Sequence, residues 1–165
     1  MRAISNSSVL IALSSIGQLS VLTQRFPDGI LIPQAVWYEV VETGGERVGA
    51  KEVAVGLNLW LTVQEVENKT LVSLLQQDLD NGEAEAIALF YEQPSEGLLL
   101  DEKKARQVSR RMVLPVIGTL GLLIWAKRQG TIPNLQEQLD ALRTLGKFRL
   151  SQQVYDEALR QVGEL

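Results

Sequence analysis

Residues 97–106 read GLLLDEKKAR, and this stretch does most to decide the fold class. Gly97–Leu100 is a short and fully apolar run, which is typical of a strand buried on both faces of a parallel sheet. Asp101 and Glu102 follow it directly, and Lys103–Met112 then has the composition of a basic helix. The stretch therefore predicts a buried strand that carries acidic side chains at its carboxyl end and leads into a helix.

Working outward, short apolar runs alternate with amphipathic helical segments along the whole chain. This alternation is typical of strands joined by crossover helices, so we expect an α/β fold with a mainly parallel sheet. Strands are expected at Ala3–Ser5, Ile30–Ile32, Gly97–Leu100, Pro115–Ile117 and, as a strand or an extended connection, Trp60–Val63. Helices are expected at Val9–Ser15, Leu19–Arg25, Gln34–Glu42, Arg47–Val55, Lys69–Leu79, Glu83–Tyr91, Lys103–Met112, Thr119–Gln129, Leu135–Leu145 and Ser151–Val162, with Asn81-Gly82 as a turn before one of them.

Composition excludes several classes of protein. The chain of 165 residues suits one globular domain, and it contains neither cysteine nor histidine. Disulfide scaffolds, thiolate zinc sites, thiol proteases, serine triads and histidine-ligated metals are therefore excluded. The formal net charge of −4 argues against a nonspecific polycation-style DNA binder. Residues 1–100 carry 5 Lys and Arg against 13 Asp and Glu, whereas residues 101–165 carry 11 against 7, so an acidic site beside a basic surface is one interpretation and a chance distribution is another.

The amino-terminal segment shows no pattern of export or of membrane insertion. Only Arg2 precedes the apolar run Val9–Leu13, which is too short to span a bilayer, and serines interrupt it. We therefore expect a cytoplasmic protein without a transmembrane helix.

Polar and acidic side chains lie near the carboxyl ends of several predicted strands, where binding crevices form in open α/β sheets. They are Asn6 with its neighbouring serines, Glu39, Glu83 with Glu85, and Asp101 with Glu102. Clustered carboxylates repel one another, and a hard divalent cation with oxygen ligands, such as magnesium or manganese, is the usual compensation. Without histidine, such a site would use the metal to lower the pKa of a bound water, which suits hydrolysis of a phosphodiester.

Each of these side chains also has a purely structural interpretation. Glu39 can lie on an exposed helix surface, Glu83 and Glu85 can be favourable charges in a first helical turn, and Asp101 can be an N-cap. The basic residues that follow Asp101 likewise allow a functional and a structural interpretation. They can bind nucleic-acid phosphates, or they can be solvated charges on a helix surface. They are Lys103, Lys104, Arg106, Arg110 and Arg111.

The order of motifs resembles the PIN-domain superfamily, in particular a branch of predicted nucleic-acid-binding proteins related to toxin–antitoxin ribonucleases. The motifs are SNSSVLIAL, LIPQAVWYEV, GEAEAIAL, LLLDEKKAR and LPVIGTLGLLIWAKRQGTI, and GKFRLSQQVYDEAL is similar to the carboxyl-terminal segment of that branch. The resemblance implies a three-layer α/β/α sandwich over a single domain, 1–165, with 133–165 as a helical extension. It also implies a magnesium- or manganese-dependent endoribonuclease, which in many members of the superfamily is the toxin of a toxin–antitoxin pair.

Matched to the family's pattern, Asn6 stands where most PIN proteins have the first metal-binding aspartate, and Ser8 where a small hydroxyl residue often lies. Glu39 matches the second acid, Glu83 the third with Glu85 as a rival, and Asp101 the fourth with Glu102 beside it. The resemblance therefore implies Glu39, Glu83 and Asp101 as catalytic residues, Asn6, Glu39, Glu83, Asp101 and Glu102 as metal ligands, and Ser8, Lys103, Lys104 and Arg106 as RNA-binding residues. Implied partners are a single-stranded RNA substrate, an antitoxin protein and a second copy of the chain.

The asparagine keeps two other functions open. An amide oxygen can bind magnesium but brings no charge, so a catalytically silent PIN-like module that binds RNA or a protein is the second hypothesis. A receiver-like phosphoacceptor is the third, because an acidic pair after a strand also suits magnesium and an aspartyl phosphate. The lysine that a receiver needs after a late strand has no convincing counterpart in this sequence.

Overall fold

The computed structural model describes all 165 residues and contains one five-stranded sheet in which every strand pair is parallel. The strand order is β3-β2-β1-β4-β5. The strands are β1 (Ala3–Ser5), β2 (Ile30–Pro33), β3 (Leu61–Gln64), β4 (Gly97–Leu99) and β5 (Val116–Ile117). The predicted α/β class with a mainly parallel sheet is confirmed.

Strand β1 occupies the centre of the sheet and pairs with strands on both sides. Ile4 lies opposite Leu31 of β2 and opposite Leu98 of β4. Because all strands run in one direction, the segments that follow β1, β2 and β4 leave the sheet at the same edge. This edge carries the predicted site residues.

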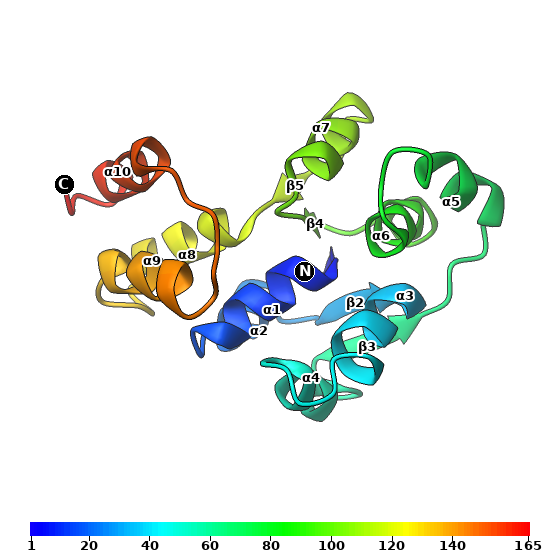
Figure 1. Ribbon diagram of the computed structural model, residues 1–165, viewed down its shortest axis with the longest axis horizontal. Coiled ribbons are helices and arrows are strands. Elements are labelled where there is room, and N and C mark those ends of the chain that lie inside the picture. Colours follow the sequence, from blue (N-terminus) through cyan, green and yellow to red (C-terminus); the bar gives the residue numbers. More distant parts are fainter.

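Helices connect the strands and fill both outer layers (Figure 1). The helices are α1 (Ser7–Ser15), α2 (Ser20–Arg25), α3 (Gln34–Trp37), α4 (Ala50–Gly56), α5 (Lys69–Leu75), α6 (Asn81–Glu92), α7 (Lys103–Arg111), α8 (Thr119–Arg128), α9 (Leu135–Thr144) and α10 (Gln152–Gln161), with a π-helix η1 (Tyr38–Glu42) after α3. No helix combines the length and the hydrophobicity that crossing a lipid bilayer requires.

Alternate residues of each strand enter two separate hydrophobic cores. Ala3 and Leu99 belong to the core under α1, α2 and α8. Their neighbours Ile4 and Leu98 belong to the core under α6 and α7. Since both faces of the sheet are buried, the structure is the three-layer α/β/α sandwich that the resemblance implied.

Two predicted elements differ in kind in the structure, and the helix expected over Lys69–Leu79 ends at Leu75, where the chain passes into a turn. The single helix expected over 34–42 is divided, since the N–H of Thr43 donates to the carbonyl of Tyr38 at 2.8 Å, a spacing of five residues that defines the π-helical turn. The turn expected at Asn81-Gly82 is wrong, because both residues belong to the first turn of α6.

The early start of α6 has a clear physical cause. Asp80 Oδ1 accepts from the N–H of Glu83 at 2.8 Å, and Glu83 Oε1 accepts from the N–H of Asp80 at 3.1 Å. This reciprocal capping box satisfies two backbone donors that a helix start would otherwise leave unpaired. It stabilises a helical first turn and overrides the hairpin preference of the Asn-Gly pair.

The last three helices pack on one another and lie at the end of the molecule opposite α5 and α6 (Figure 1). Glu164 joins them, since its carboxylate accepts from the N–H groups of Leu135 and Gln136 at 2.7 and 3.0 Å and pairs with Lys127 at 3.3 Å. Burial by itself would raise the pKa of Glu164, but these hydrogen bonds and the lysine outweigh it and hold the pKa below its ordinary value. The carboxylate thus serves as a tertiary cap for α9.

Replacing Glu164 by glutamine should lower the free energy of unfolding by about 1–2 kcal/mol at pH 7, because charged hydrogen bonds to the α9 amides are weakened. The pKa of Glu164 is lower in the folded chain than in the unfolded chain, so its contribution is complete above the unfolded pKa and is lost as the pH falls through the folded pKa. Urea unfolding at a series of pH values measures both effects.

The matched control is Glu157→Gln, which breaks an exposed pair with Arg160 and should change stability by less than about 0.5 kcal/mol. Equal effects of the two substitutions would contradict the assigned role of Glu164.

Candidate active site

The segment after β1 places buried polar groups at the carboxyl edge of the sheet. Asn6 is only 3% exposed, and its N–H donates to the carbonyl of Leu99 at 3.1 Å. It occupies the N-cap position of α1, but its side chain makes no capping bond; Oδ1 instead accepts from the hydroxyl of Ser8 at 2.9 Å. The amide group is therefore held at the edge by Ser8 rather than used to cap the helix.

Glu39 lies on η1 and reaches the segments that follow other strands. Its Oε1 accepts from the hydroxyl of Ser7 at 2.9 Å. A β-carbon placed on Gly82 would lie only 3.1 Å from Glu39 Oε2, so the other carboxylate oxygen faces the first turn of α6. The π-turn that carries Glu39 is a type of irregularity that occurs frequently at functional sites.

Glu83 is 7% exposed at the start of α6. Burial raises the pKa of Glu83 to about 7; the nearby charges of Asp80 and Glu102 add to this rise, while the hydrogen bond from the N–H of Asp80 opposes it. Glu83 therefore lies within electrostatic range of the acids that follow β4. The side chain of Glu83 also accepts from the N–H of Asp80 in the capping box. Glu83 therefore has a structural role at the start of α6 in addition to its position in the site.

Asp101 follows β4 and is held by the first residue of α8. Thr119 donates its N–H to Oδ1 at 2.7 Å and its hydroxyl to Oδ2 at 2.6 Å. Burial raises the pKa of Asp101, although the Thr119 hydrogen bonds and the charge of Arg106 act in the opposite direction. A β-carbon on Gly118 would lie 3.1 Å from Asp101 Oδ1 and 3.0 Å from Arg106 Nη1, so a larger residue there would press on both side chains.

These contacts connect the predicted acids into one region, which we call the acidic edge and define as Asn6, Glu39, Glu83, Asp101 and Glu102. Ser7 joins the segment after β1 to Glu39, and Glu39 in turn faces the start of α6. Burial is the main cause of the raised pKa values of Glu83 and Asp101, and the charge of Glu102 adds to both. A cavity of about 440 Å³ borders this edge and is lined in part by Ser8, Asp101 and Glu102.

The donor chemistry of the acidic edge fits a hard divalent cation, because its amide, carboxyl and hydroxyl groups offer oxygen atoms only. In the arrangement seen here, no three carboxyl groups are close enough together to hold one metal ion. Two of the acids are instead turned to backbone donors, Glu83 to Asp80 and Asp101 to Thr119. Binding of a cation by all of these groups would therefore require their side chains to rotate.

Glu85, the rival of Glu83, has a different position. Its Oε1 accepts from the N–H of Ala35 at 3.2 Å, where β2 passes into α3. Glu85 lines a separate cavity of about 520 Å³ together with Glu39 and Asp80, whereas Glu83 is the acid whose pKa is raised in part by the charge of Glu102.

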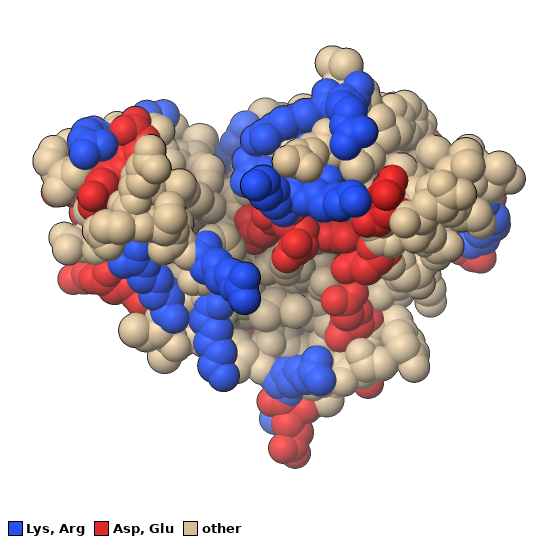
Figure 2. Space-filling view, turned by 45° about the horizontal axis from the view of Figure 1, so that its top comes forward, with Lys and Arg blue, Asp and Glu red and all other residues tan.

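Three of the predicted RNA-binding residues, Lys103, Lys104 and Arg106, lie on α7, whereas Ser8 lies on α1. Lys104 forms an ion pair with Asp78 at 3.4 Å, while Lys103 has no acidic partner within 4 Å. Nε of Arg106 is buried without a hydrogen-bond partner. Figure 2 shows acidic side chains gathered at the middle of one face, with basic side chains bordering them on more than one side.

Two residues of the site were not singled out from the sequence as members of it. Asp80 holds Glu83 and Thr119 holds Asp101 through hydrogen bonds, whereas Ser7, which holds Glu39, is one of the serines that were expected beside Asn6. The signal for Asp80 was the pattern D-x-x-E before an apolar run, which predicts a capping box. No local signal identified Thr119, because its partner lies 18 residues away.

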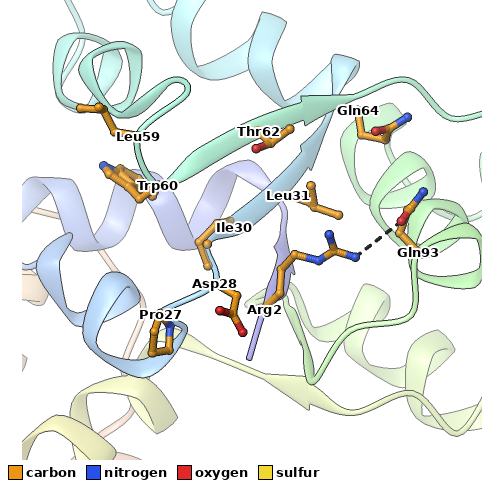
Figure 3. A pocket seen from close by; sticks show the side chains of 11 residues that line it. Arg2, Pro27, Asp28, Ile30, Leu31, Leu59, Trp60, Thr62, Gln64 and Gln93 are labelled. Carbon is orange, nitrogen blue, oxygen red and sulfur yellow. Dashed lines mark hydrogen bonds between the residues drawn. The ribbon is translucent and has the colours of Figure 1, made fainter.

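A third cavity, of about 240 Å³, contains none of the predicted site residues. It is lined by residues that precede or belong to β1, β2 and β3, including Arg2, Asp28, Trp60 and Thr62 (Figure 3). The guanidinium of Arg2 crosses it and donates to Gln93 at 3.5 Å. The lining extends from the amino-terminal ends of β1 and β2 to Gln64, the last residue of β3, and includes no residue of the acidic edge.

Comparison with known proteins gives one match. A family model described as a PIN domain matches residues 2–164. No curated protein and no solved structure matches the chain.

The raised pKa of Glu83 predicts how substitution alters the metal-free protein. In the folded chain the pKa is about 7, against an ordinary value of 4.5, so burial of the ionised carboxyl destabilises the fold progressively as the pH rises between these values. Glu83→Gln keeps a side chain that can complete the capping box and removes the charge. It should raise the free energy of unfolding by about 1–3 kcal/mol at pH 8 and by much less at pH 4.5.

Urea unfolding with a chelator present measures this difference, and Glu42→Gln, on an exposed position, provides a control that should stay within about 0.5 kcal/mol of the unsubstituted protein. If the Glu83→Gln protein is no more stable than the unsubstituted protein at pH 8, burial of the ionised Glu83 carboxyl group does not destabilise the fold, and the raised pKa is contradicted.

Proposed function

Because the chain belongs to the PIN-domain family, whose members are generally nucleases, we propose that it is a magnesium- or manganese-dependent endoribonuclease that hydrolyses RNA phosphodiester bonds. The observation that carries the proposal is the meeting of Asn6, Glu39, Glu83 and Asp101 at one edge of the sheet. These residues come from four separate segments of the chain. Ser7 links the segment after β1 to Glu39, Glu39 faces the first turn of α6, and Ser8, which binds Asn6, lines one cavity together with Asp101. Oxygen donors of this kind suit the metal ions that act in phosphoryl transfer.

In this proposal Glu39, Glu83 and Asp101 are the catalytic carboxylates, and together with Asn6 and Glu102 they would hold the cation. When bound, the cation would supply a water of lowered pKa and would neutralise negative charge on the phosphodiester. The protein groups around it have their own tasks. Ser7 and Thr119 orient carboxylates through hydrogen bonds, whereas Ser8, Lys103, Lys104 and Arg106 would bind the RNA backbone.

A second candidate function is a PIN-like module that binds RNA or a protein and does not cut. Two observations favour it: Asn6 contributes an uncharged amide in place of a carboxylate, and no three carboxyl groups lie together in the arrangement seen here. Such a module would bind RNA and would show no measurable affinity for magnesium or manganese.

We also make proposals about the physiological role of the enzyme and about its protein partners. We propose that the enzyme acts as the toxin of a toxin–antitoxin pair, with a small antitoxin protein encoded beside it. The groove of about 580 Å³ between α8 and α10, lined by Leu120, Ile124 and Val154, is the apolar surface proposed for a second copy of the chain. Sedimentation of the purified protein measures the oligomeric state directly.

RNA cleavage by the purified protein should require magnesium or manganese and should depend on Asp101. Asp101→Asn retains an oxygen that can accept from Thr119 but loses the negative charge, so cleavage should fall by about 100-fold or more. Gel analysis of labelled single-stranded RNA, with and without each metal, measures the rate.

Asp156→Asn, a matched change at a half-buried position of α10 where the carboxylate accepts from Gln152, is the control and should cleave like the unsubstituted protein. Cleavage that is equal in the Asp101→Asn and unsubstituted proteins would refute the assignment.

Restoring a carboxylate at position 6 should strengthen metal binding. Asn6→Asp preserves an acceptor for the Ser8 hydroxyl and adds a negative charge to the acidic edge, so the dissociation constant for manganese should fall by about tenfold or more. The metal-free variant should also be less stable, because the new carboxylate is buried among other acids. Isothermal titration calorimetry and urea unfolding measure the two effects, and an unchanged manganese affinity would place Asn6 outside the metal site.

A further inference from the structure

The cavity beside the acidic edge has a basic wall that comes from the carboxyl-terminal part of the chain. Its lining combines Ser8, Asp101 and Glu102 with Lys147 and Arg149. The last two belong to the connection between α9 and α10, and we call residues 146–149 the basic loop. A volume of about 440 Å³ lies in the range typical of small-ligand sites. Groups of opposite charge therefore face one space of a size that can receive part of a polymeric ligand.

We propose that Lys147 and Arg149 bind backbone phosphates of single-stranded RNA and hold the strand against the acidic edge. The inference rests on the proposed ribonuclease function for its choice of ligand. It adds two substrate-binding residues, and a role in substrate binding for the carboxyl-terminal helices, to the binding surface on α7.

The first argument is that both cations are free to bind an anion. Lys147 and Arg149 are exposed, and neither forms an ion pair or donates a side-chain hydrogen bond within the protein. Other basic side chains have partners: Lys104 pairs with Asp78, and Arg143 lies over the ring of Tyr155 and donates to the carbonyl of Leu150. Cations that face acids without pairing with them are suited to an added phosphate.

The second argument is that the basic loop is held in place by its backbone. Phe148 donates its N–H to the carbonyl of Leu142 at 2.9 Å, and its ring packs against the core. A β-carbon on Gly146 would lie 2.7 Å from the hydroxyl of Ser15, so the loop lies directly against the end of α1. Because Phe148 is anchored to the core between them, the exposed side chains of Lys147 and Arg149 are kept at the cavity.

The third argument is electrostatic. RNA phosphates that approach Asp101 and Glu102 are repelled by these carboxylates, and cations on the opposite side of the same cavity offset that repulsion. The exposed basic groups of α7 and the basic loop border the acidic edge from different parts of the chain, in keeping with the basic side chains around the acidic centre in Figure 2. A strand bound between them would pass over the acids.

The experiment compares RNA binding by three double variants of the full chain. Lys147→Gln/Arg149→Gln removes both charges, Lys147→Arg/Arg149→Lys exchanges the residues and keeps both charges, and Lys69→Gln/Arg160→Gln removes two charges that pair locally with Glu65 and Glu157. Fluorescence anisotropy with a short labelled single-stranded RNA, in chelator so that no cleavage occurs, measures the dissociation constant over a range of salt concentrations. Unfolding midpoints establish that all variants are folded.

The neutral loop variant should bind the RNA about tenfold more weakly at moderate salt, and the slope of log K against log salt should fall by about 1.4, the value for two phosphate contacts on a single strand. The charge-retaining variant and the Lys69/Arg160 control should bind like the unsubstituted protein. In cleavage assays the neutral variant should raise KM and leave kcat unchanged, because the loop binds the strand and does not contact the reacting atoms.

The outcomes separate this inference from the proposed function. Unchanged RNA binding by the neutral loop variant, or no RNA binding by the unsubstituted protein, overturns the inference. If Asp101→Asn loses cleavage while the neutral loop variant binds RNA normally, the proposed ribonuclease function is supported and the proposed role of the basic loop is refuted. Loss of RNA binding in the neutral variant of a protein that never cleaves RNA would support the inference and refute the ribonuclease.

Discussion

The parallel pairing of β1 with both β2 and β4 is the constraint on which the rest of the structure depends. It places Asn6, Ser7 and Ser8 in the middle of the carboxyl edge, between the segments that follow the two neighbouring strands. It also sends Ala3 and Ile4 into different cores. A register shift of one residue in β1 would exchange these two side chains between the cores and would move the site residues as well, so the packing of the sheet and the geometry of the site are specified together.

The acids of the candidate site also stabilise the fold around them. Glu83 completes the capping box of α6, Asp101 binds the first residue of α8, and Glu39 binds the hydroxyl of Ser7. The structural and functional interpretations of these residues therefore do not compete. Burial of Glu83 close to other carboxyl groups is unfavourable without a counter-charge, which is why its pKa is raised. Polar contacts of this kind maintain the positions of the acids in the metal-free protein.

The fold brings acidic and basic side chains from different parts of the chain to neighbouring positions. The acidic residues that precede position 100 contribute Glu39 and Glu83 to the edge of the sheet. The more basic part of the chain contributes α7 on one side and the basic loop on another. Segments far apart in the sequence are thus brought to one surface, where carboxylates suited to a cation lie beside cations suited to a polyanion, the combination that a metal-dependent nuclease of the PIN family would use.

The sequence by itself determined the α/β class, the places of the strands and the set of acidic residues at their ends, because apolar runs and side-chain chemistry are local properties. Leu98 and Leu99, for example, predict a buried strand whatever lies beside them. Only the tertiary structure decided the π-turn under Glu39, the binding of Asp101 by Thr119 and the position of Lys147 and Arg149 beside Ser8. Each of these features depends on contacts or packing between segments far apart in the chain. Such interactions form only when the sheet brings the segments together, so local sequence patterns do not predict them.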